Sequence, residues 1–181
     1  YFQQEVNYTI HVSLDDRENF LRGDINISYQ NNSPDTLKYV MFHLWPNAYK
    51  NEFTAFAKQF LENGSTQFLY AADSMRGFID SLNFEVDGIR SSIEYDATNP
   101  DIGKVKLPVP LPPGKKVFFY TPFRVKIPYT FSRMGHVGQQ YQISQWFPKP
   151  AVYDRYGWHA MPYLDQGEFY SEFGSFDVFI T

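Results

Sequence analysis

Apolar and polar residues alternate along the first thirty residues of the chain. Successive side chains of a strand point to opposite faces, so the alternation over residues 5–14 predicts a half-buried β-strand. The pattern returns over residues 21–29 after the polar turn DDRE, and we expect the two strands to form a hairpin. A third strand is predicted over residues 37–44, where the apolar run is more continuous and a central position in a sheet is favoured.

Further strand patterns follow in the middle and at the end of the chain. Residues 78–86 and 89–95 flank Asp87-Gly88, a dipeptide that favours a two-residue hairpin turn. Strands are also expected over residues 104–107 and 117–127, with the run PVPLPPGKK between them. A PxxP pattern of this kind can bind proline-recognising modules, but between two strands we interpret it as a stiff connection. The terminal segment FDVFIT alternates as a strand does.

One amphipathic helix is expected, over residues 51–62. Its apolar positions recur at spacings of three and four residues, as on one face of a helix. Asn51 is the candidate N-cap, and Asn63-Gly64 is the candidate left-handed stop. Many short strands with a single helix and no βαβ alternation predict an all-β fold, a sandwich of mostly antiparallel sheets.

Composition narrows the functional classes. The chain has 181 residues, of which 19% are aromatic, and a net charge of −4 without a basic run. Nucleic acid and anionic membranes are therefore not expected partners. No apolar run reaches the length of a transmembrane segment, about 20 residues. Cysteine is absent, which excludes disulfides and thiolate metal sites.

Catalytic motifs are missing from the chain. The four histidines are scattered, no HExxH is present, and neither a G-x-S-x-G elbow nor a phosphate-binding glycine loop occurs. Carboxylates near the C-terminus are numerous enough for a glycosidase pair, but nothing in the sequence makes two of them face each other. The chain taken alone is not predicted to be an enzyme, and no metal ligands are assigned.

The most distinctive segment lies in the last quarter, residues 139–181. It contains ISQWFPKPAVYDRYGWH, in which two tryptophans surround two prolines. Residues before proline are disfavoured in helices, so we expect a long loop that is packed rather than flexible. Long packed loops often carry function; the alternative is a loop that only covers one end of the sandwich.

Three segments of the chain resemble the N-terminal domain of aminopeptidase N-like (gluzincin) zinc metallopeptidases, most of all their secreted bacterial branch. They are YFQQEVNYTIHVSLDD, GDINISYQNNSPDTLKYVMFHLWPNAY and ISQWFPKPAVYDRYGWHAMPYLDQGEFYSEFGSFDVFIT. Together they cover about half of the chain. The resemblance implies a saddle-like β-sandwich that precedes a thermolysin-like catalytic domain of the same chain, which would hold the zinc.

The same resemblance sets the expected domain organisation. Residues 1–181 would be a single N-terminal β-domain, cut before the catalytic domain, because the chain starts without Met and stops within a strand pattern. The fragment itself would need no cofactor. The parent protein would hydrolyse peptide substrates from their N-termini, and a periplasmic or extracellular location in a bacterium is implied.

The resemblance also suggests site residues. In the family a glutamine of a Thr-Gln or similar pair at a strand end helps to hold the substrate α-amino group. The matching pair here is Ser144-Gln145, with Trp146 and Phe147 either lining the first subsite or simply packing. The residues expected to brace the loop or to meet the catalytic domain are Ser144, Asp154, Arg155, Trp158, His159, Glu168 and Tyr170.

Two other hypotheses stay open from the sequence. The chain could be a free-standing carbohydrate- or peptide-binding β-sandwich that uses Trp45, Trp146 and Trp158 as stacking platforms. It could also be a bare scaffold domain whose loop never reaches a substrate. Three exposed, coplanar tryptophans would favour the binding module, whereas an exposed apolar patch around residues 146–170 would favour a partner domain.

Overall fold

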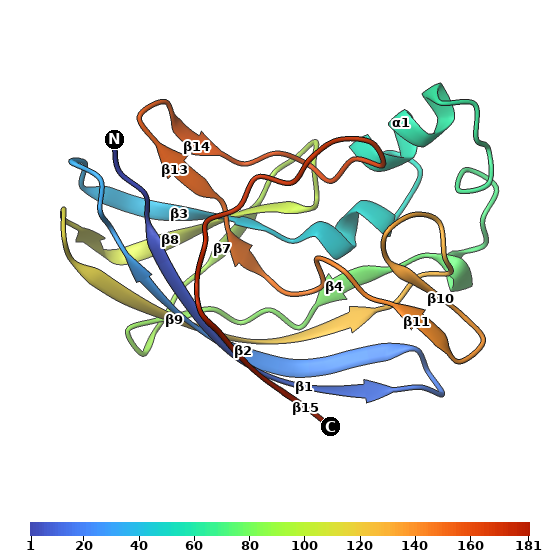
Figure 1. Cartoon of the computed structure of the whole chain (residues 1–181), viewed down its shortest axis with the longest axis horizontal. Coiled ribbons are helices and arrows are strands. Elements are labelled where there is room, and N and C mark those ends of the chain that lie inside the picture. The colour runs from blue at the N-terminus through green and yellow to red at the C-terminus, as the bar shows by residue number, and fades with distance from the viewer.

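The computed structural model describes all residues from Tyr1 to Thr181 and is predominantly β (Figure 1). The strands are β1 (Glu5–Asp15), β2 (Phe20–Gln30), β3 (Leu37–His43), β4 (Phe78–Asp80), β5 (Glu85–Val86), β6 (Ile89–Arg90), β7 (Ile93–Tyr95), β8 (Ile102–Leu111), β9 (Lys116–Lys126), β10 (Gly135–Val137), β11 (Gln140–Gln142), β12 (Lys149–Pro150), β13 (Val152–Asp154), β14 (Gly157–His159) and β15 (Phe176–Ile180). The helices are α1 (Ala55–Glu62) and two 3₁₀ helices, η1 (Trp45–Tyr49) and η2 (Asp73–Met75). None of them combines the length and the apolar character that a membrane crossing demands.

Two larger sheets form the body of the domain. A seven-stranded sheet has the order β15-β1-β2-β9-β5-β6, with β4 also paired to β9, and a four-stranded sheet has the order β12-β3-β8-β7. All pairs within them are antiparallel except β1 with β15, which run parallel. The hairpins β10–β11 and β13–β14 form two separate small sheets. The predicted all-β class with mostly antiparallel sheets is confirmed.

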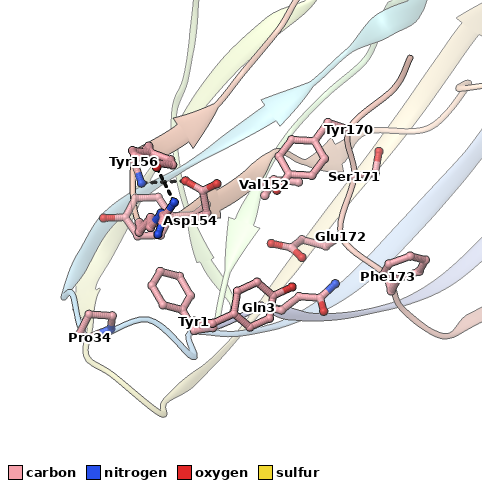
Figure 2. Close-up of a pocket in the computed structure, with 13 residues that line it drawn as sticks. Tyr1, Gln3, Pro34, Val152, Asp154, Tyr156, Tyr170, Ser171, Glu172 and Phe173 are labelled. Carbon is pink, nitrogen blue, oxygen red and sulfur yellow. Dashed lines mark hydrogen bonds between the residues drawn. The ribbon is translucent and has the colours of Figure 1, made fainter.

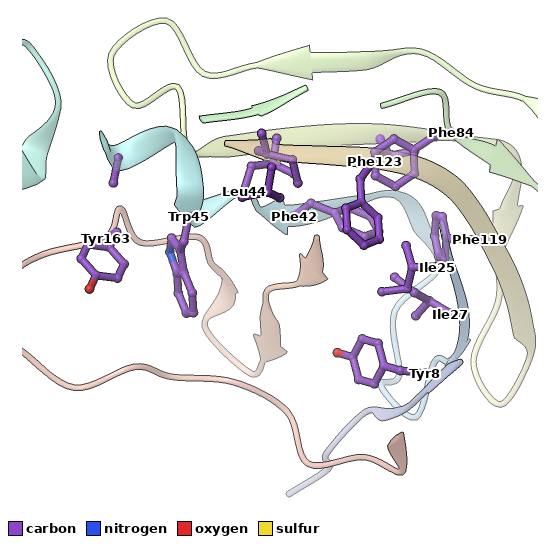
Figure 3. Close-up of a cluster of buried hydrophobic side chains, with 14 of the residues drawn as sticks. Tyr8, Ile25, Ile27, Phe42, Leu44, Trp45, Phe84, Phe119, Phe123 and Tyr163 are labelled. Atoms are coloured by element: carbon purple, nitrogen blue, oxygen red, sulfur yellow. The ribbon is translucent and has the colours of Figure 1, made fainter. Parts of the chain in front are cut away.

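The core lies between the inner faces of the two large sheets (Figure 3). Phe42 of β3 meets Phe119 of β9 edge-on, with 5.3 Å between ring centroids, and Phe84 packs beside Phe42 at 4.9 Å. The alternating residues of β1 and β2 supply the other inner positions, among them Tyr8, Ile25 and Ile27. Their burial is why the period-two pattern predicted the first hairpin correctly.

The helix is shorter than expected. Its N-cap is Thr54, whose hydroxyl accepts a hydrogen bond from the Ala57 N–H at 3.2 Å. Asn51 instead closes a local turn, with its side-chain oxygen accepting from the Phe53 N–H at 2.9 Å. The predicted N-cap was therefore wrong. Asn and Thr are both common N-cap residues, and the helix begins after Thr54. The predicted C-terminal end of the helix was right: Asn63 is the C-cap and Gly64 has φ +85°.

The predicted hairpin around Asp87-Gly88 has the right turn and shorter strands. Both turn residues have positive φ, +50° and +77°, as this turn requires. The expected strand over residues 78–86 is divided into β4 and β5, which pair with different parts of β9. Between them the Asn83 N–H donates to the Thr121 hydroxyl at 2.9 Å instead of to a ladder carbonyl.

The proline-rich run is also partly strand. Pro108 and Pro110 belong to β8, and only residues 112–115 form the connection to β9 in the other sheet. The register of β8 against β3 shifts between Leu37 and Tyr39. Proline has no N–H for a ladder, so this irregularity accommodates both residues within a paired strand.

Candidate functional site

The irregular segment 143–148, which joins β11 to β12, packs on the rest of the domain. The Ser144 hydroxyl donates to the Arg133 carbonyl at 2.6 Å. Trp146 packs against Phe123, with ring centroids 5.9 Å apart. Phe147 packs edge-on against Tyr8 at 5.6 Å. The expectation of a packed loop is correct, and both aromatic side chains are half-buried.

Gln145 lies within this segment rather than at a strand end. Its backbone is in the left-handed region, with φ +55°, a conformation that is unfavourable for residues other than glycine. Its side-chain oxygen accepts a hydrogen bond from the Lys149 ammonium. Lysine can only donate, so this contact fixes which end of the amide is the oxygen and leaves the Gln145 NH₂ group free.

Lys149 is the unusual residue of the site, and the sequence did not reveal it. Its side chain is buried, with 8% exposure, and it forms no ion pair. The ammonium lies 4.7 Å from the centre of the Trp45 ring and 5.4 Å from that of Phe147. The Ser171 hydroxyl is 3.4 Å away. Burial without a counter-charge lowers the pKa of Lys149 to about 8.

His43 of β3 is the strand partner of Lys149 in β12. Its ring is 4.3 Å from that of Trp45, and its Nδ1 is 3.1 Å from the Met161 carbonyl oxygen. Nε2 has no partner. Burial and the positive charge of Lys149 lower the pKa of His43 to about 3, so it is neutral at physiological pH. We call Gln145, Lys149, Ser171, Trp45 and His43 the lysine cluster.

A second group of expected residues lies on the β13–β14 hairpin. Asp154 and the His159 ring are 2.8 Å apart, and Asp154 also accepts from the Tyr156 N–H at 2.8 Å. These contacts hold the pKa of Asp154 below its usual value. Trp158 packs on Tyr153 at 4.9 Å. Of the predicted bracing residues, these form internal contacts of the hairpin and do not reach Gln145.

The remaining predicted residues are distributed differently. Tyr170 stacks edge-on against His159 at 5.3 Å, which ties the C-terminal segment to the hairpin. The Arg155 guanidinium is exposed and lies over the Tyr156 ring at 4.6 Å. Glu168 is exposed, apart from both groups.

The tryptophans do not form a stacking platform. Trp45 is 1% exposed and belongs to the core. Trp146 packs against Phe123 and Phe147, and Trp158 packs against Tyr39 and Tyr153. Three exposed tryptophans would have favoured the binding module, and the buried Trp45 cannot serve as one of its stacking platforms. Apolar exposure is instead concentrated on β15 and just before it, where Phe173 is 85% and Ile180 72% exposed.

No group of three or more histidines, aspartates or glutamates is arranged to hold a metal ion. The lysine cluster offers a donor amide, a hydroxyl and a weakly basic amine beside aromatic rings. Such an arrangement can bind polar groups of a ligand by hydrogen bonds.

Comparison with known proteins gives matches among solved structures alone. No protein-family model matches the sequence, and no curated protein matches it. An M1 zinc metallopeptidase from Deinococcus radiodurans is 14% identical, with a TM-score of 0.43 over 72% of this chain and 22% of that chain. An aminopeptidase N family protein from Idiomarina loihiensis is 9% identical, with a TM-score of 0.31 over 70% of this chain and 16% of that one.

A Legionella pneumophila protein provisionally described as a nutrient binding protein is 12% identical, with a TM-score of 0.42 over 68% of this chain and 40% of that chain. The chain thus spans well under half the length of each of these solved structures.

Proposed function

We propose that this chain is the N-terminal domain of a zinc metalloaminopeptidase, and that it packs on the catalytic domain and contributes to the pocket for the substrate N-terminus. The observation that carries the proposal is that the three segments responsible for the sequence resemblance meet in one place. Tyr8 of the first segment contacts Phe147 of the third. Trp45 of the second lies over Lys149 of the third.

Gln145 is the residue proposed to face the substrate. It is half-buried in a packed segment, and its amide orientation is fixed by Lys149, so little entropy is lost when a ligand binds. The amide oxygen has two acceptor positions, and Lys149 uses one of them. The second is available to a substrate α-ammonium, while the free NH₂ group can donate to a peptide carbonyl.

Lys149 makes this binding dependent on its own protonation. An α-ammonium bound at the second acceptor position of the Gln145 oxygen would lie beside the Lys149 ammonium. The two neighbouring positive charges would repel each other. Its pKa of about 8 lets Lys149 release its proton at little cost near neutral pH. We propose that substrate binding is coupled to loss of the Lys149 proton.

The exposed apolar side chains on β15 support a docking role for this edge of the sheet. The strand is paired on only one edge, and four of its apolar side chains are exposed: Phe176, Val178, Phe179 and Ile180. Exposed apolar patches of this kind are usually covered by another part of a protein. The zinc of the proposed enzyme would be held by residues outside this chain, because its own residues offer no ligand set.

The test uses the full-length protein that contains this chain. It should hydrolyse alanine p-nitroanilide, lose that activity with a chelator and regain it with zinc, and leave N-acetyl-alanine p-nitroanilide intact. Gln145→Ala should raise KM at least roughly tenfold, since a hydrogen bond to a charged group is worth about 1.5–3 kcal/mol. Gln139→Ala, which removes an exposed glutamine, is the matched control.

Absence of zinc-dependent aminopeptidase activity would overturn the proposed function. Aminopeptidase activity with an unchanged KM in Gln145→Ala would support the proposed enzyme class and contradict the proposed role of Gln145 in substrate binding. The proposed periplasmic or extracellular location rests on the sequence resemblance alone. Cell fractionation of the source bacterium, with an antibody to this domain, tests it.

A further inference from the structure

A cavity of the domain lies away from Gln145. It has a volume of about 670 Å³ and is bounded by the N-terminal segment, the β13–β14 hairpin and residues 170–173. Figure 2 shows the side chains that line it. Aromatic rings form much of the wall, including those of Tyr153, Tyr156 and Tyr170. Ser171, which also belongs to the lysine cluster, lies at its edge.

A buried carboxylate faces this cavity. Glu172 is 9% exposed, its Oε1 has no hydrogen-bond partner, and Figure 2 shows its carboxylate directed into the space between the aromatic rings. An unpaired polar atom in such a position is destabilising unless a ligand satisfies it. Burial raises the pKa of Glu172, and hydrogen bonding from the Gln4 backbone, the Gln3 side chain and the Tyr153 backbone opposes that shift.

A second carboxylate lies on the same cavity wall. Asp154 lines the cavity and has a pKa below its usual value, held there by His159 and the Tyr156 N–H. Negative charge from both acids reaches the ring of Tyr170, whose pKa is raised by burial and by Asp154 and Glu172. Arg155 is the one cationic side chain of the wall; its guanidinium lies over the Tyr156 ring and donates to the Tyr156 hydroxyl, and it keeps its positive charge.

A wall of aromatic rings with a buried carboxylate that has an unpaired oxygen is chemically suited to an organic cation. The faces of aromatic rings attract ammonium groups, and a nearby carboxylate adds a charge-assisted hydrogen bond. A bare metal ion fits less well, because no group of three acidic or histidine ligands is arranged around a point. An anion would meet two carboxylates.

We propose that the cavity between residues 1–3, the β13–β14 hairpin and residues 170–173 binds a primary alkylammonium group, with Glu172 as its hydrogen-bond acceptor. The inference does not depend on the proposed function, because the cavity excludes Gln145 and its ligand requires no zinc. The alkylammonium can come from a lysine side chain of a peptide or from a free amine.

The test is a titration of the full chain with n-butylammonium. Binding is measured from the NMR signals of the tyrosine rings and by calorimetry. Butanol, which has a similar shape and no charge, is the ligand control. Butylammonium should shift the ring signals of Tyr153, Tyr156 and Tyr170, and butanol should bind at least roughly tenfold more weakly. N-acetyl-lysine N-methylamide separates the sources: tighter binding than butylammonium indicates a peptide side chain, and equal or weaker binding indicates a free amine.

Two variants test the acceptor. Glu172→Gln keeps the shape and removes the charge, and it should weaken butylammonium binding at least roughly tenfold. Glu62→Gln, which removes an exposed carboxylate of α1, should leave the affinity unchanged. If Glu172→Gln does not fold, the butylammonium-induced shifts of the tyrosine ring signals in the unmodified protein still test the proposal. No shift at millimolar butylammonium, shifts outside the cavity, or equal binding of butanol would each overturn the proposal.

Discussion

The buried lysine permits a quantitative prediction on stability. The pKa of Lys149 falls from 10.5 to about 8 on folding, and one pKa unit corresponds to about 1.4 kcal/mol. Between these values the unfolded chain binds more protons than the folded one, so stability rises with pH from about 8 to 10.5. Below pH 8 the full penalty of about 3 kcal/mol is present.

Replacement of Lys149 by methionine removes this linkage. Met fills a similar volume and has no charge to desolvate. The loss of hydrogen bonds to Gln145 and Ser171 acts at both pH values, because a neutral amine also donates. The stability of the original protein relative to Lys149→Met should therefore increase by about 2.5 kcal/mol between pH 7 and pH 10.

Urea unfolding of both proteins at the two pH values measures this quantity. Lys58→Met, which removes an exposed lysine of α1, controls for the loss of one lysine. A difference between original and variant that is the same at pH 7 and pH 10, within about 0.5 kcal/mol, would refute the reasoning. The Lys149 ammonium would then be solvated or paired with an acid, and the proposed coupling to substrate binding would fall with it.

Three further predictions concern the frame of the site. Phe56→Ala should lower the free energy of unfolding by about 3–5 kcal/mol in urea titrations, because this fully buried ring of α1 packs on Tyr49 and Tyr163; a loss below about 1 kcal/mol would contradict the packing. Gly174→Ala should cost about 1–3 kcal/mol, since an added Cβ would lie 1.8 Å from the Val6 carbonyl oxygen; an unchanged melting temperature would be evidence against that close approach. Asp101→Asn should stabilise the protein by up to about 3 kcal/mol at pH 8 and little at pH 3. Burial raises the pKa of Asp101 from 3.8 to about 6, so the contribution of Asp101 to stability is fully present below pH 3.8 and is lost as pH rises through 6; urea midpoints that change equally at both pH values would refute it.

Local sequence chemistry predicted the parts of the fold that depend on neighbouring residues. Alternation with a period of two identified β1 and β2, and Asp87-Gly88 identified its turn. Sequence-based prediction failed where two nearby residues were equally good caps, so that the helix begins at Thr54 instead of Asn51. It also failed where the partner strand decides the outcome, as for the division of residues 78–86 along β9.

The sequence also led to Gln145 as the candidate residue, but only through resemblance. Nothing local indicated that Lys149 is buried beside it, because a lysine between two prolines is usually exposed. The burial arises from Trp45, which is 104 positions away along the chain, and from Ser171. Likewise Glu172 is one of several carboxylates in the C-terminal segment, and its lack of a partner is visible only in the folded chain.

By itself the sequence determined the class of fold, the first hairpin, the turn at Asp87-Gly88 and the end of the helix, because strand period, turn conformation and capping act over a few residues. The tertiary structure alone decided the parallel pairing of β15 with β1, the lysine cluster and the aromatic cavity at Glu172. Each of these depends on contacts between distant segments. Their energies come from burial and from electrostatics in a medium of low polarity, which exist only once the sheets have packed.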